Sequence, residues 1–219
     1  MATVGADFVW RMEDVLDLYA EGYDARRPWV CFDEKPYQLL SHTRDPLPVE
    51  PGQPRRIDYE YQREGTCNVF LFFDPHRAWR RLEVTEQRTA VDFAHQMRWL
   101  VDEGYPEAEV VRVVLDNLNT HSLASLYQAF PPEEARRIAR RLEFHPTPKH
   151  ASWLNMAEIE FSVLERQCLD RRLPSRGAVA HEVAAWEADR NALGATVHWR
   201  FTTADARIKL HRFYPAQTQ

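Results

Sequence analysis

The stretch EVVRVVLD, residues 109–116, decides the fold of this chain. Its valine-rich run predicts a buried β-strand, and that strand ends on Asp116. A second apolar run, WVCF at residues 29–32, comes after Pro28 and is followed directly by Asp33. It also predicts a short buried strand. Each of the two strands is therefore expected to present an aspartate at its C-terminal end.

The sequence around these two strands predicts the remaining elements. Apolar residues at helical spacing indicate several helical stretches. These cover residues 8–20, 89–102, 131–142, 153–169, 175–192 and 203–214. Residues 67–73 and 78–84 predict a β-hairpin, and residues 142–145 predict a short strand. Residues 41–57 contain four prolines around Gly52, which predicts a surface loop.

The order of these elements predicts an α/β fold with a mixed five-stranded sheet flanked by helices. Strands that are joined through a helix pair in parallel, whereas the two hairpin strands pair antiparallel. In sheets of this kind the reactive site lies beyond the carboxyl ends of the strands. We therefore expect Asp33 and Asp116 to lie close together in a functional site.

The composition is typical of one globular domain, since the 219 residues are 44% hydrophobic and 28% charged. No apolar run reaches the roughly 18–20 residues of a membrane span, and no signal peptide is recognisable, so we expect a cytoplasmic protein with no membrane partner. Cys31, Cys67 and Cys168 lack metal-binding spacing and are expected to be buried thiols. The 7 glycines form no phosphate-binding loop.

The net charge of −5 argues against a nucleic-acid partner, because phosphate contacts usually require a basic protein. Cations bound to a cluster of acidic ligands would cancel part of that charge. The arginines also occur in local pairs, such as Arg136-Arg137 and Arg140-Arg141. Taken alone, each pair is more typical of a solvated surface than of a phosphate site. The charge therefore leaves nucleic-acid binding open.

Two carboxylates at neighbouring strand ends repel each other unless a cation lies between them. Carboxylate oxygens suit Mg²⁺ or Mn²⁺, and two such ions can activate the attacking oxygen and stabilise the leaving oxygen in phosphodiester chemistry. A third carboxylate is then expected on the helix that begins near Trp153. Glu158 and Glu160 lie on opposite flanks of its apolar face, so helix geometry does not choose between them. Asn155 and Glu158 also fit a capping box, which would give Glu158 a purely structural role.

Three blocks of the sequence resemble, in the same order, the catalytic blocks of bacterial insertion-sequence transposases of the mariner superfamily. They are FDEKP at residues 32–36, LDNLNTH at 115–121 and PTPKHASWLNMAE at 146–158. The resemblance implies a ribonuclease H-like fold and a triad of acids that binds two divalent metal ions, Mg²⁺ or Mn²⁺. In the family's third block the acid follows a Leu-Asn pair after two intervening residues. The implied catalytic and metal-binding residues are therefore Asp33, Asp116 and Glu158.

The third block departs from the family's common form at two positions. Met156 and Ala157 stand where most members have Pro-Ile, and this keeps Glu160 as the alternative third acid. With the resemblance in place, we divide the chain into an N-terminal helix and linker at residues 1–25 and a DDE catalytic domain at residues 26–219.

The resemblance implies a transposase domain that cleaves DNA and transfers strands at insertion-sequence ends. Its implied partner is double-stranded DNA, as terminal inverted repeats and as target, and it would act at the bacterial nucleoid. Family members carry N-terminal helix-turn-helix domains, and we recognise none before Asp33. The chain would then be a truncated or split-frame copy, or a separate DNA-binding polypeptide would supply the specificity. A homodimer is a further candidate assembly. A ribonuclease H-like nuclease without strand transfer, or an inactive remnant that binds DNA or a protein, are the alternatives.

Several residues beside the acids are candidates for DNA contact or for support of the site. They are Asn119, His121, Lys149, His150, Trp153 and Asn155. The first two would touch the scissile phosphate or order the loop after Asp116. Lys149, His150 and Trp153 would pair with phosphates or stack on bases. Capping at the first two positions and a core position for Trp153 are the structural alternatives.

Overall fold

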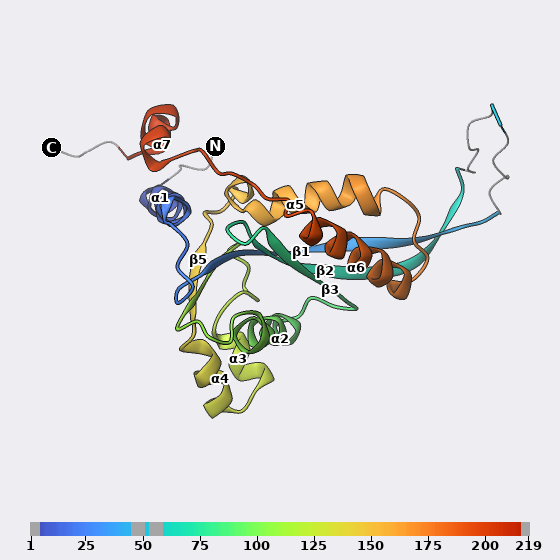
Figure 1. The fold of residues 1–219 in the computed structure, drawn as a ribbon, viewed down its shortest axis with the longest axis horizontal. Coiled ribbons are helices and arrows are strands. Elements are labelled where there is room, and N and C mark those ends of the chain that lie inside the picture. The colour runs from blue at the N-terminus through green and yellow to red at the C-terminus, as the bar shows by residue number, and fades with distance from the viewer. Residues whose placement is uncertain (1–4, 45–50, 53–58, 216–219) are drawn as a thin grey trace.

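The structure, a computed structural model, describes residues 5–44, 51–52 and 59–215 and contains a five-stranded sheet in the order β3-β2-β1-β4-β5 (Figure 1). The strands are β1 Trp29–His42, β2 Tyr61–Asp74, β3 Trp79–Thr85, β4 Val111–Leu115 and β5 Leu142–Pro146. β2 pairs antiparallel with both β1 and β3, whereas β4 pairs parallel with both β1 and β5. The predicted mixed five-stranded sheet is confirmed.

Helices form in all six stretches where the sequence predicts them. The α-helices of the described residues are α1 Ala6–Ala20, α2 Ala90–Trp99, α3 Ala124–Ala129, α4 Pro132–Ala139, α5 Met156–Leu164, α6 Arg176–Ala192 and α7 Thr203–Lys209. Short 3₁₀ or π-helical turns are η1 Leu100–Gly104, η2 Ser152–Leu154, η3 Glu165–Leu169 and η4 His211–Phe213. The helix predicted at 153–169 is interrupted, because Asn155 has an extended backbone and begins α5 as its N-cap. The short helix α3 was not predicted.

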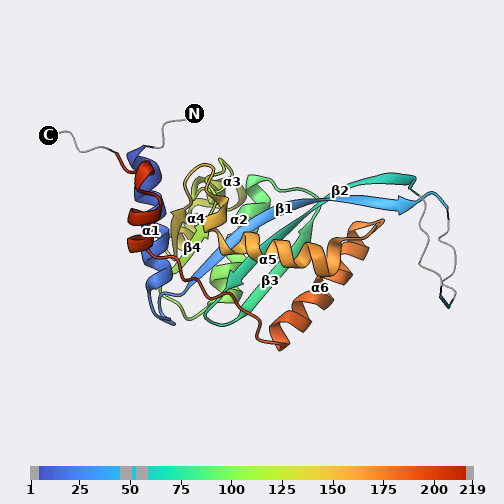
Figure 2. The same ribbon diagram turned by 90° about the horizontal axis from the view of Figure 1, so that it is seen from above.

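The helices cover both faces of the sheet (Figures 1 and 2). α2, α3 and α4 pack on one face, and α1, α5 and α6 pack on the other. Successive residues of β1 alternate between these two cores: Trp29 and Cys31 belong to the core under α5, and Val30 and Phe32 to the core under α2. The pleat of a strand requires this alternation. Continued along β1, it directs Asp33 toward α5 and Glu34 toward α2.

An aromatic cluster fixes β1 to the α2 layer. The ring of Phe32 lies 5.9 Å from Phe70, 4.9 Å from Phe72 and 5.5 Å from Phe93, measured between centroids. All four side chains are buried. Burying one phenylalanine contributes about 1.5–3 kcal/mol to the free energy of folding. The position of the residues that follow Phe32 is therefore set by a well-packed core.

The predicted end of β1 is wrong. Asp33 is the fifth residue of a 14-residue strand rather than the first residue after a short one. The parallel partner β4 pairs only with Trp29 to Cys31, and β1 then continues as the partner of β2 as far as His42. The extension carries no apolar run, because its ladder is made by backbone hydrogen bonds to β2 and most of its residues beyond Glu34 are only partly buried.

Other expectations concern the loop, the cysteines and the membrane. Most of the loop predicted at 41–57 lies outside the described residues; Ser41 and His42 belong to β1. The cysteines are buried free thiols, as predicted. Within the ranges that the structure describes, no helix combines the length and the apolar character needed to cross a membrane.

Candidate active site

The register between β1 and β4 brings the two aspartates to the same level of the sheet. Trp29 pairs with Arg112 and Cys31 with Val114 in the parallel ladder. Two residues further along each chain lie Asp33 and Asp116, the latter directly after the last residue of β4. The charge of Asp116 contributes to raising the pKa of Asp33, as expected for carboxylates that lie near each other. Asp33 and Asp116 therefore lie on neighbouring strands at the same level, as the sequence predicted, although Asp33 lies within β1 rather than at its end.

Asp33 is held in a buried position by the backbone and by the start of α5. Its Oδ1 accepts a hydrogen bond of 2.8 Å from the backbone N–H of Glu34. The Asn155 side chain donates to the carbonyl of Phe32 at 2.9 Å, and its Nδ2 lies 3.5 Å from Asp33 Oδ2. Asn155 Oδ1 accepts from the Ala157 N–H at 3.1 Å and so caps α5. One asparagine therefore ties the N-terminus of α5 to β1 beside Asp33.

This tie brings Glu158, in the first turn of α5, near Asp33. Burial raises the pKa of Asp33 to about 8, and the charge of Glu158 is the next largest cause. The capping-box alternative for Glu158 is not formed: the backbone N–H of Asn155 donates instead to the carbonyl of Ser152 at 2.8 Å. Glu158 is exposed to solvent. Its carboxylate is therefore free of the structural role that the sequence allowed.

Glu160 has the opposite environment. Its side chain is 0% exposed, with one carboxylate oxygen 3.1 Å from Arg80 Nε and the other 2.9 Å from Arg190 Nη2. These arginines belong to β3 and α6, so Glu160 joins three elements. A carboxylate committed to two guanidinium groups has little capacity left for a metal ion. The structure therefore favours Glu158 over Glu160, and the assignment of the third acid stays a prediction.

His121 and Glu34 lie behind Asp116. The His121 side chain is 1% exposed, with Nδ1 2.5 Å from Asp116 Oδ1 and Nε2 2.9 Å from Glu34 Oε2. Burial lowers the pKa of His121, but its contacts with Asp116 and Glu34 outweigh that effect and raise the pKa to about 9. Sequence reasoning gave Glu34 no role. Its alternation with Val30 and Phe32 on the buried face of β1 was the signal that could have singled it out.

The remaining predicted contacts lie in turns and in the short helix η2. Asn119, Lys149 and His150 are exposed residues of turns. The Trp153 side chain is 44% exposed, and its ring lies 6.4 Å from the ring of Trp199 and 5.9 Å from that of Phe201, between centroids. Trp153 thus combines a packing role with an accessible surface. DNA contact by these residues stays a prediction.

The chemistry of the acids fits a divalent cation. Among the described residues, no arginine or lysine forms an ion pair with Asp33, Asp116 or Glu158. Burying a carboxylate without a cationic partner is costly, which makes Asp33 a position that an added cation would stabilise. Within the same part of the chain, no three His, Cys, Asp or Glu side chains are close enough together to hold a metal ion as they stand. The exposed Glu158 side chain would have to change rotamer to complete such a set.

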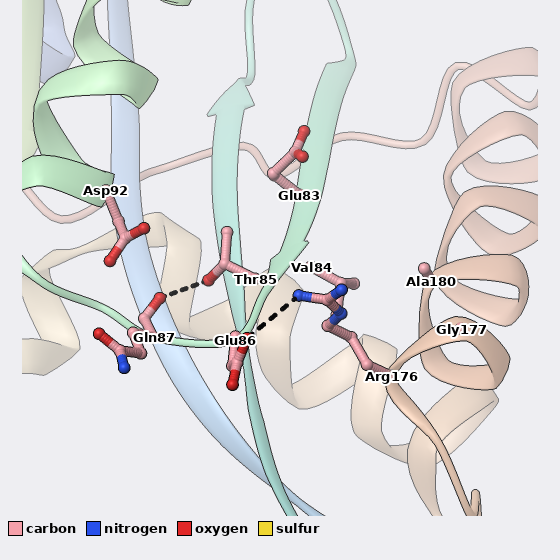
Figure 3. A pocket seen from close by; sticks show the side chains of 9 residues that line it. All are labelled: Glu83, Val84, Thr85, Glu86, Gln87, Asp92, Arg176, Gly177 and Ala180. Atoms are coloured by element: carbon pink, nitrogen blue, oxygen red, sulfur yellow. Dashed lines mark hydrogen bonds and ion pairs between the residues drawn. The ribbon is translucent and has the colours of Figure 1, made fainter.

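A hollow elsewhere on the protein is shown in Figure 3. It is formed by the end of β3, the turn that follows and the start of α6, and Arg176 there lies 3.9 Å from Glu86. None of the predicted site residues lines it. It therefore supplies nothing to the candidate active site.

A comparison with family models decides the family. Residues 28–180 match the model described as DDE superfamily endonuclease. The chain belongs to this superfamily. The matched segment of the DDE endonuclease domain contains Asp33, Asp116 and Glu158. No curated protein matches the chain.

Solved structures support the same fold for the DDE endonuclease domain. The Mos1 strand transfer complex has a TM-score of 0.58 at 16% identity, covering 85% of this chain and 56% of the Mos1 chain. The Mos1 paired-end complex with the left transposon end and the Mos1 mariner paired-end complex with Mn both give a TM-score of 0.56 at 18% identity, covering 87% of this chain. This chain spans 58% and 59% of the length of those two chains. The predicted ribonuclease H-like fold is confirmed.

Proposed function

We propose that this chain is the catalytic domain of a transposase that cleaves DNA and transfers strands at the ends of an insertion sequence. One observation carries the proposal: the buried Asp33 feels the charges of both Glu158 and Asp116 in a DDE endonuclease domain, and none of the three has an arginine or lysine partner among the described residues. The structural likeness to Mos1, solved as a strand transfer complex, supports joining as well as cutting.

Two divalent ions would complete the site. Asp33 and Asp116 would share one ion and Glu158 would hold the other. Mos1 has been solved with Mn and with Mg. When bound, Mg²⁺ or Mn²⁺ would supply activation of the attacking oxygen and stabilisation of the leaving oxygen.

The protein's own residues would fix the geometry of the reaction. Asn155 holds β1 and α5 together beside Asp33, and His121 contacts Asp116, so two of the acids are restrained before DNA arrives. Glu158 is exposed and would close onto the site when the ions and DNA bind. Restraint of this kind matters because phosphoryl transfer depends mainly on positioning and on electrostatic stabilisation.

Double-stranded DNA would be the partner, as terminal inverted repeats and as target. Lys149 and His150 are exposed on the turn before α5 and would pair with phosphates, while the accessible part of Trp153 would stack on a base. Asn119 would contact the DNA strand that lies beside Asp116. A second copy of the chain and a separate DNA-binding polypeptide are proposed as further partners, and action on chromosomal DNA would place the protein at the nucleoid in the cytoplasm.

The test combines a supercoiled plasmid with a labelled duplex that carries a free 3′-hydroxyl, in the presence of MnCl₂ or MgCl₂. We expect nicking of the plasmid and joining of the label to it, and both should be lost in Asp116→Ala. Glu86→Gln, at an exposed acid that lines the hollow of Figure 3, is the matched control and should behave as wild type. Nicking without joining would support a nuclease without strand transfer. Absence of both activities in the wild type would support an inactive remnant.

A further inference from the structure

Glu34 is a buried acid on the face of β1 opposite to Asp33. Its side chain is 2% exposed and lies in the layer of α2, beneath the phenylalanine cluster. A buried carboxylate is costly unless it is paired. The partners of Glu34 are His121 Nε2 at 2.9 Å and Arg88 Nη1 at 3.6 Å. The side chain of Glu34 therefore contacts His121 on this face, and through His121 it is linked to Asp116.

The imidazole of His121 is held in a single orientation. Its ring stacks on Phe93 with centroids 4.8 Å apart and meets Phe32 edge-on at 5.4 Å. With the ring plane set by these contacts, one nitrogen faces Glu34 and the other faces Asp116. The two carboxylates come from different strands, so the imidazole links the loop after β4 to β1.

Asp116 needs such a link more than Asp33 does. Asp33 lies inside β1, where it pairs with Leu71 of β2, whereas Asp116 is the first residue after β4 and its side chain is partly exposed. The segment from Asp116 to His121 contains no helix or strand. Its turn is closed by the backbone N–H of His121, which donates to the carbonyl of Leu118 at 3.0 Å. Without the imidazole, the Asp116 carboxylate would be free to rotate.

We propose that Glu34 and His121 form a positioning pair that holds the Asp116 carboxylate in the orientation required to bind a divalent ion. Glu34 orients the imidazole, and the imidazole orients Asp116. Neither residue needs to touch DNA or the ion. This role rests on the proposed function of Asp116, and it adds Glu34 to the residues on which that function depends.

The test measures binding of Mn²⁺ alone, by calorimetry or electron paramagnetic resonance, and then nicking as a function of MnCl₂ and DNA concentration. Changes to groups that orient a metal ligand typically cost about 10- to 100-fold in metal affinity or activity. We expect a loss of that size in Mn²⁺ affinity for both Glu34→Gln and His121→Phe, with the KM for DNA unchanged. Glu34→Gln retains the size of the side chain, and His121→Phe retains the aromatic packing. In the Asp116→Asn background neither change should weaken Mn²⁺ binding further.

Arg88→Gln is the matched control, because Arg88 also contacts Glu34 but is half exposed and does not reach Asp116. It should change Mn²⁺ affinity by less than about 3-fold. The positioning role is overturned if folded Glu34→Gln and His121→Phe bind Mn²⁺ as the wild type does. It is also overturned if a crystal structure of Glu34→Gln shows the Asp116 carboxylate unmoved. A wild type that neither binds Mn²⁺ nor nicks DNA would instead overturn the proposed function itself, and the positioning role with it.

Discussion

Helix α5 contributes one glutamate to each of two side-chain clusters, and the two clusters differ in how their charges are paired. The acid cluster, Asp33, Asp116 and Glu158, has no arginine or lysine partner among the described residues. The arginine cluster, Arg80, Glu160 and Arg190, is neutralised by its own guanidinium groups. Asp116 contacts the imidazole of His121, whereas Asp33 and Glu158 have no cationic partner among the described residues and are the positions where an external cation would gain most. Charge compensation separates Glu158 from Glu160, although they are two residues apart.

The largest expected effect is on stability, from Glu160→Ala. The change would leave the Arg80 guanidinium, whose side chain is 0% exposed, without its carboxylate. Breaking a buried ion pair by removing one partner costs about 3–5 kcal/mol in the free energy of unfolding. Urea denaturation, with Glu158→Ala as control, measures this difference. If the free energy of unfolding fell by less than about 1 kcal/mol, the arginine cluster would contribute no more than an ordinary surface ion pair. The proposed difference between the two clusters would then be wrong.

Asp33→Asn should have the opposite consequences. Metal-dependent nicking should fall by at least about 100-fold, because a group that positions charge in the transition state is removed. The free energy of unfolding in EDTA should be unchanged or higher, since the variant removes a buried carboxylate that has no cationic partner. Chemical denaturation in EDTA and a nicking assay measure the two effects. A destabilisation as large as that of Glu160→Ala would show that Asp33 belongs to the fold rather than to the site.

Added Mn²⁺ should stabilise the wild type through the acid cluster alone. A ligand that binds only the folded state contributes about 2.7 kcal/mol at a free concentration of 100 times its Kd. We expect Tm to rise with MnCl₂ for the wild type and for Glu86→Gln, and to stay constant for Asp33→Asn. Differential scanning fluorimetry over a range of MnCl₂ concentrations reports this shift. An equal rise in all three proteins would locate the bound ion elsewhere.

The smallest expected effect is that of Glu158→Gln on stability. Its side chain is exposed, so the free energy of unfolding should change by less than about 0.5 kcal/mol. Nicking should nevertheless be lost, because one ion would lack its carboxylate ligand. Paired measurements on Glu158→Gln and Glu160→Gln sharpen the comparison. If Glu158→Gln retained nicking and a folded Glu160→Gln lost it, Glu160 would be the third acid and Glu158 would not.

The sequence predicted the sheet and six helical stretches, and it placed Asp33 and Asp116 on neighbouring strands, because these features follow from local runs of residues. It did not predict the length of β1, since the continuation past Asp33 depends on pairing with β2. It could not choose between Glu158 and Glu160 by helix phase, because Arg80 and Arg190 come from distant elements. These failures share a cause: the deciding partner lies far away along the chain. The family resemblance favoured Glu158 from the spacing of its motif alone, without the ion pairs of Glu160 as a reason.

The alternation along β1 has a consequence for how the chain tolerates insertions and deletions. Asp33 and Glu34 lie back to back, one toward α5 and one toward the His121 ring. Gaining or losing one residue between Trp29 and Asp33 would exchange their faces and also turn Phe32 out of its aromatic cluster. A substitution in β1 therefore changes one side chain at a time. A shift of the strand by one residue would instead displace Asp33, Glu34 and Phe32 together.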